Sequence, residues 1–245
     1  AGFFQHGGFA LGPILLVFLG TDSWIPLYIG MAVVLAGLLP LGLTGAAATF
    51  EGHESSARIF HFLRVAPGLM IAGFMFGLID SATLSLLPVY GLRKDLSSEL
   101  AESMLSIFVI GAMLGQIPMG ILSERFGARK LILAGAVMSL ACLLAMPHLI
   151  TDPILIFPLL GLLGAGLGTF YTVALVDMGR RFKGGALIGV TTTFMFLWAT
   201  GAVIGPGISG LAIELGGPDA MPYTGAVLTM AFIGLLIMRI RQNDP

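Results

Sequence analysis

Asp80 is the only charged residue in the apolar stretch 65–92. If this stretch forms one helix from Ala66, its carboxyl group lies about 21 Å along the axis, near mid-bilayer. An ionisable side chain at that depth costs several kcal/mol unless it faces a cavity or a partner. Two interpretations follow. Asp80 is a proton or cation site that faces a cavity, or it forms a structural hydrogen bond to Thr83 or Ser85 at helical spacing.

Other polar side chains also occur inside long apolar stretches. They are Gln116, Tyr171, the threonine run 191–193 and Trp198. One interpretation places them with Asp80 around a common cavity. The other assigns them to hydrogen bonds between helices, worth about 0.6 kcal/mol each, with Trp198 as a packing residue.

A short basic segment, GILSERFGARK, separates two apolar stretches. Its pattern is formed by Gly120, Glu124, Arg125, Gly127, Arg129 and Lys130. The glycines allow close backbone approach and tight turning, and the acidic side chain is favoured near a helix N-terminus. We predict an ion pair between Arg129 and Asp177, which ends its own apolar stretch at the same level. Such a pair would hold this face closed in one of two states.

The amino-acid composition indicates a membrane protein, so these polar groups would lie within a bilayer. Hydrophobic residues make up 57% of the 245-residue chain, and charged residues 10%. Soluble domains carry about 25% charged residues. The mean hydropathy of +0.99 therefore excludes a soluble globule or a disordered chain. A net charge of −1 argues against a nucleic-acid partner.

The apolar stretches predict an all-α membrane protein, a polytopic helical bundle with eight transmembrane helices. The expected spans are 3–20, 24–43, 66–91, 100–122, 131–149, 153–177, 186–213 and 220–238. Stretches such as 134–146 lack the alternation of a membrane β-barrel. Of the twelve Lys and Arg residues, ten fall in 44–65, 123–130, 178–185 and the tail. We expect that side, including the C-terminus, to be cytoplasmic.

An internal repeat relates the beginning of the chain to its end. Segments 9–26 and 202–222 each contain Gly-Pro, then Leu-Gly, Asp and Pro. The pairs Gly12-Pro13 and Gly205-Pro206 would have the same orientation, since six spans separate them. Such parallel repeats are typical of transporters built from two related halves. We therefore expect four further spans before residue 1, with chance similarity of glycine-rich sequence as the alternative.

The basic segment resembles the loop motif of the major facilitator superfamily (MFS) of secondary transporters. In that family the motif joins the second and third helices of each half, as 120–130 would here, although Asp is commoner than Glu at position 124. The resemblance implies helices five to twelve of a twelve-helix chain. Residues 1–43 would end the N-terminal half, 44–65 would be the central cytoplasmic loop, and 66–245 would form the C-terminal half.

The resemblance also implies a function. It is secondary active transport of a small solute by alternating access, coupled to protons through Asp80 or to another ion, in a bacterial inner membrane. The alternative is a non-transporting membrane sensor or assembly factor. We expect neither an enzyme nor a cofactor or metal site. The four histidines lack ligand spacing, and the single cysteine, Cys142, lies in an apolar run.

Overall fold

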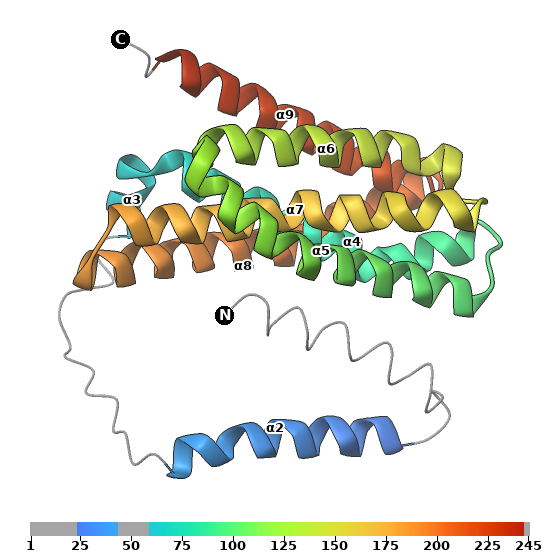
Figure 1. Cartoon of the computed structure of the whole chain (residues 1–245). Coiled ribbons are helices and arrows are strands. Elements are labelled where there is room, and N and C mark those ends of the chain that lie inside the picture. Colours follow the sequence, from blue (N-terminus) through green and yellow to red (C-terminus); the bar gives the residue numbers. More distant parts are fainter. Residues whose placement is uncertain (1–23, 44–58, 243–245) are drawn as a thin grey trace.

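The computed structural model describes residues 24–43 and 59–242, and every regular element within those ranges is a helix (Figure 1). The helices are α2 (Ile25–Leu43), α3 (Ile59–Val65), α4 (Pro67–Arg93), α5 (Ser98–Phe126), α6 (Ala128–Leu149), α7 (Pro153–Arg181), α8 (Gly184–Gly216) and α9 (Ala220–Gln242). Six of them, α4 to α9, are long and apolar enough to cross a membrane. The all-α prediction is confirmed. The predicted span 3–20 and the Gly12-Pro13 pair lie outside the described residues.

Two helix starts follow directly from capping signals in the sequence. The Ser97 side chain accepts a hydrogen bond from the Leu100 amide at 3.3 Å, where α5 begins. The Asp152 carboxylate accepts one from the Ile154 amide at 2.9 Å, and Pro153 opens α7. Both caps satisfy amide groups that the first helical turn leaves without partners.

The helices extend beyond the uncharged stretches that predicted them. The predicted span 100–122 lies within α5, and 153–177 within α7. Charged side chains mark the ends of the predicted spans, but long charged side chains can reach water from a helix that continues, so they do not end the helix itself. The expected loop 123–130 is therefore reduced to Gly127 between α5 and α6, and part of the expected loop 44–65 is helix α3.

Two helix pairs, α4 with α8 and α5 with α7, approach each other at glycines. A Cβ atom at Gly205 of α8 would clash with the carbonyl oxygen of Leu78 in α4. A Cβ atom at Gly164 of α7 would clash with the carbonyl oxygen of Phe108 in α5. Small residues serve this purpose in membranes, where close packing drives helix association. Helix α6 packs on α7 and α9, while α2 lies apart from these helices (Figure 1).

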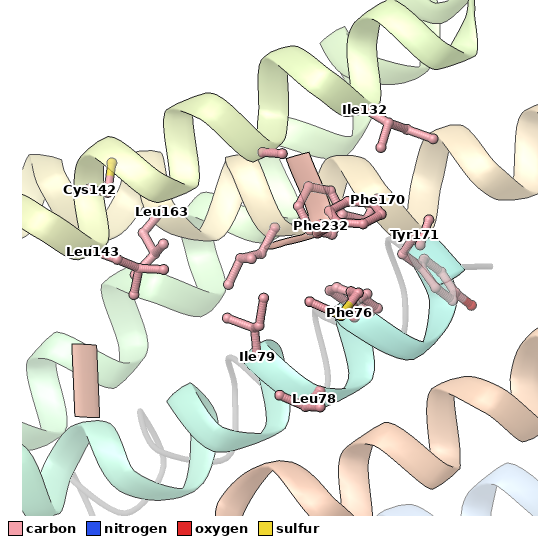
Figure 2. Close-up of a cluster of buried hydrophobic side chains, with 14 of the residues drawn as sticks. Phe76, Leu78, Ile79, Ile132, Cys142, Leu143, Leu163, Phe170, Tyr171 and Phe232 are labelled. Carbon is pink, nitrogen blue, oxygen red and sulfur yellow. The ribbon is translucent and has the colours of Figure 1, made fainter. Parts of the chain in front are cut away.

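The buried core joins the helices around aromatic contacts (Figure 2). The rings of Phe170 and Phe232 are 5.1 Å apart and join α7 to α9. The rings of Phe76 and Tyr171 are 5.6 Å apart and join α4 to α7. Cys142 is buried in the same core, as its apolar surroundings in the sequence predict.

Candidate functional site

Asp80 lies in the middle of α4 and is 5% exposed. Among the described residues, no side chain or backbone group forms a hydrogen bond or ion pair with it. The Thr83 hydroxyl donates instead to the carbonyl oxygen of Ile79 at 2.8 Å. The alternative of a structural bond to Thr83 is therefore wrong for this conformation, and Ser85 provides no such bond either.

Asp80 faces a cavity of about 290 Å³. The cavity is lined by Phe76, Asp80, Ser81, Leu84, Ser85, Phe108, Val109, Ala112, Tyr171, Met195, Trp198 and Ala202. These residues come from α4, α5, α7 and α8, whereas α6 and α9 contribute none. Asp80 is the only charged side chain among them, so the cavity is apolar apart from one carboxyl group and a few hydroxyl and indole groups.

The structure brings Tyr171 and Trp198 to this cavity with Asp80. Tyr171 is held between the rings of Phe76, at 5.6 Å, and Phe194, at 6.0 Å. The Nε1 atom of Trp198 is buried and has no hydrogen-bond partner in the described part of the chain. A buried donor without a partner costs free energy in this conformation.

Gln116 and the threonine run do not join the cavity lining. Gln116 is buried on α5, one turn beyond Ala112, the last residue of α5 in the lining. The hydroxyls of Thr192 and Thr193 donate to carbonyl groups one turn earlier in α8, at 2.9 and 2.8 Å. Hydroxyl groups in apolar helices readily form such local bonds.

Several lining residues had no distinguishing sequence signal. Phe76, Phe108 and Met195 are apolar residues in apolar helices, so only the packing of the helices reveals that they face Asp80. Ser81 and Ser85 were detectable, because they are polar and lie near Asp80 on the same helix. Serines in membrane helices more often bond to their own backbone, which weakens that signal.

The basic segment adopts the tight connection that its second glycine predicts. Gly127 has φ +82°, a conformation that favours glycine, and it joins the end of α5 to the start of α6. The expected close approach at Gly120 is wrong, because a Cβ atom there would meet only a methyl group of Thr172, at 3.9 Å. Glu124, Arg125 and Lys130 are exposed and form no ion pair with another described residue.

Asp177 does not pair with Arg129 in this conformation. Its Oδ1 accepts a hydrogen bond from Nε of Arg181 at 2.9 Å, and its Oδ2 lies 2.8 Å from Nη2 of the same residue. Arg181 is one helical turn away on α7, so this pairing needs no movement between helices. Arg129, at the start of α6, lines the same cavity as Asp177 and Arg181. Arg129 and Asp177 thus lie near each other, but the carboxylate pairs with Arg181, which the sequence analysis did not predict.

The Gly205-Pro206 pair positions α8 against the segment of α4 that carries Asp80. Gly205 allows the contact with Leu78, two residues before Asp80, and Pro206 lies within the helix. Trp198 and Ala202, which line the cavity, precede this contact on α8.

Comparison with known proteins identifies the family. Residues 69–245 match the Major Facilitator Superfamily, which is more than half of the chain. The chain belongs to this superfamily. Its MFS relatives include an uncharacterized MFS-type transporter of Enterobacter sp. (strain 638), 25% identical over 97% of this chain and 61% of the relative. Another is the uncharacterized MFS-type transporter YfkF of Bacillus subtilis (strain 168), 24% identical over 83% and 53%.

A third relative is the uncharacterized MFS-type transporter YcaD of Salmonella typhi, 25% identical over 89% of this chain and 56% of the relative. The chain therefore covers 53 to 61% of the length of these three MFS relatives. The MFS assignment and the six apolar helices support an integral membrane protein.

Proposed function

We propose that the protein is a secondary active transporter that moves a small solute across a bacterial inner membrane by alternating access, with proton coupling through Asp80. One observation carries the proposal. Asp80 is buried in an apolar cavity at the middle of α4, and no described residue neutralises its charge. Protonation removes the cost of that charge, and so does a bound cation. Binding of a proton or a cation to this carboxyl group would therefore change the relative stability of the open and closed states.

The arrangement of helices supports a site between two halves. The cavity lies between α4, α5, α7 and α8, while α6 and α9 support the bundle from outside that site. In this proposal residues 66–245 are the C-terminal half, 1–43 end the N-terminal half, and 44–65 link them. The second wall of the transport cavity would come from the N-terminal half. Rocking of the halves would expose the cavity to each side in turn.

The basic end of the bundle supplies a gate in this proposal. It carries the segment from Gly120 to Lys130, with Asp177 and Arg181 close by, and it would face the cytoplasm together with the C-terminus. Asp177 would exchange Arg181 for Arg129 when the cytoplasmic side closes. A difference of a few kcal/mol between the two pairings is enough to bias a two-state gate.

The test is proton movement in proteoliposomes that contain the complete protein as its gene encodes it. A pH-sensitive dye inside the vesicles reports proton flux when candidate solutes are added outside, one class at a time. We expect at least one solute to change the internal pH, and Asp80→Asn to abolish that change. The matched control is Asp95→Asn, which removes an exposed carboxylate just beyond the end of α4.

Two results would contradict the proposal. Solute-dependent proton flux that persists in Asp80→Asn would remove Asp80 from the coupling step. Absence of gradient-driven flux for every solute class, together with stable co-purification of another membrane protein, would favour the sensor or assembly factor instead.

A further inference from the structure

A second cavity lies at the end of the bundle where α4 begins, and it has a strongly positive lining. Its volume is about 290 Å³, and its walls come from the end of α3, the starts of α4 and α6, and the ends of α7 and α9. Arg64, Arg129 and Arg181 line it, together with a single carboxylate, Asp177. Guanidinium groups remain charged in proteins, so three positive charges face one negative charge.

The single carboxylate in the lining, that of Asp177, is already paired with an arginine. Both oxygen atoms of Asp177 are engaged by Arg181, at 2.9 and 2.8 Å. Arg64 and Arg129 form no hydrogen bond or ion pair with any other residue that the structure describes. Two guanidinium groups on different elements, α3 and α6, therefore line one cavity without a counter-ion among residues 24–43 and 59–242.

The first turn of α4 leaves one backbone donor beside the same cavity, the Gly68 amide, because Pro67 has no N–H and the Leu69 amide donates to the carbonyl oxygen of Ala66 at 3.1 Å. Ala66 precedes the helix and offers no side-chain cap, Pro67 occupies its first turn, and Gly68 also lines the cavity. The first amide groups of a helix have no partner within it, and the N-terminus carries a partial positive charge. Because α4 has 27 residues, its N-terminal end has a fully developed dipole. Such ends bind phosphate groups readily.

Apolar side chains complete the cavity beside the arginines. Val65, Leu69, Ile132 and Leu236 line it, and Val65 is 52% exposed. A ligand with a phosphate group and an apolar portion would satisfy both parts of the lining. Guanidinium groups bind phosphate through paired hydrogen bonds, which lysine cannot reproduce.

We propose that this cavity binds a phosphate group between Arg64, Arg129 and the first turn of α4, carried by a phospholipid headgroup or by a soluble phosphate compound. The site is distinct from the cavity at Asp80, and it shares Arg129 with the gate proposed above. A ligand held there would bridge α3, α4 and α6, at the point where the segment 44–65 joins the C-terminal bundle.

The experiment measures ligand binding to the complete purified protein by native mass spectrometry. The probes are phosphatidylglycerol, phosphatidylcholine as the zwitterionic lipid, and inorganic phosphate. We expect phosphatidylglycerol to bind, and Arg64→Gln/Arg129→Gln to weaken that binding about tenfold or more, since hydrogen bonds to charged groups are worth about 1.5–3 kcal/mol. The matched control is Arg180→Gln, which removes an exposed arginine next to Arg181 that does not line the cavity.

The three probes also distinguish the two sources of the phosphate group. Preference for phosphatidylglycerol over inorganic phosphate, lost in the double variant, supports a lipid headgroup. Binding of inorganic phosphate with the same dependence on Arg64 and Arg129 supports a soluble ligand. Arg64→Lys/Arg129→Lys keeps both charges and serves if the glutamine variant does not fold, with reduced but measurable binding expected. Equal binding by the double variant and the native protein, or equal loss in Arg180→Gln, would overturn the proposal.

Discussion

Nζ of Lys94 lies 2.7 Å from Oδ2 of Asp219, so the end of α4 is tied to the turn between α8 and α9. The other carboxylate oxygen of Asp219 accepts a hydrogen bond from the Tyr90 hydroxyl at 3.0 Å. Tyr90 is fully buried, whereas the side chains of Lys94 and Asp219 are 25% and 39% exposed. Exposed ion pairs contribute little, so the tyrosine bond is the stronger part of this cluster.

Replacement of Asp219 therefore tests the Tyr90 bond. Asp219→Ala leaves the buried hydroxyl without its acceptor, and we expect a loss of about 1–3 kcal/mol, seen as a lower melting temperature in detergent. Lys94→Met should cost less than about 1 kcal/mol. Tyr90→Phe added to Asp219→Ala should recover part of the loss. An equal effect of Lys94→Met and Asp219→Ala would show that the ion pair dominates.

The contact between α4 and α8 predicts opposite results at two glycines of the same helix. Gly205→Ala places a methyl group against the carbonyl oxygen of Leu78, and we expect about 1–3 kcal/mol of destabilisation from overpacking. Gly207→Ala meets nothing within 4 Å and should be tolerated. The stability of both variants is assessed by the melting temperature and by the yield of protein in the membrane fraction. Similar behaviour of the two variants would mean that the helices do not approach as described.

Removal of the charge at Asp80 should separate stability from transport. Asp80 has a buried carboxyl group that pairs with no described residue. Asp80→Leu replaces it by an apolar side chain, which matches the mostly apolar lining of the cavity. We expect an unchanged or higher melting temperature together with loss of solute-dependent proton flux, the usual trade-off at a functional site. A marked fall in melting temperature for both Asp80→Leu and Asp80→Asn would indicate a structural role for Asp80.

Exchange of charges tests the proposed gate. Arg129→Glu should lower transport, because the closed state would lose its Arg129–Asp177 pair. Addition of Asp177→Arg should restore a measurable part of the flux by forming the pair in reverse. When two residues contact each other, the effect of replacing both differs from the sum of the two single effects. A double variant as inactive as the more severe single variant would argue against contact between these positions in any state of the cycle.

The sequence predicted the helices well because a bilayer leaves the backbone few alternatives. Every peptide group in the hydrocarbon core must bond within its own helix, so long apolar stretches identify the elements. The boundaries were less accurate. The charges at Glu124 and Asp177 predict the ends of two spans, but α5 continues to Phe126 and α7 to Arg181.

The amino-acid sequence was sufficient to predict a helical membrane protein with one carboxyl group in the middle of an apolar helix, and the segment 120–130 indicated the family. Only the packing of the helices shows that Tyr171 and Trp198 share a cavity with Asp80 while Gln116 does not, and that Asp177 pairs with Arg181. Hydropathy is a property of each segment alone. Which face of a helix meets a cavity depends instead on its rotation against its neighbours, and here glycine contacts such as Gly205 with Leu78 set that rotation.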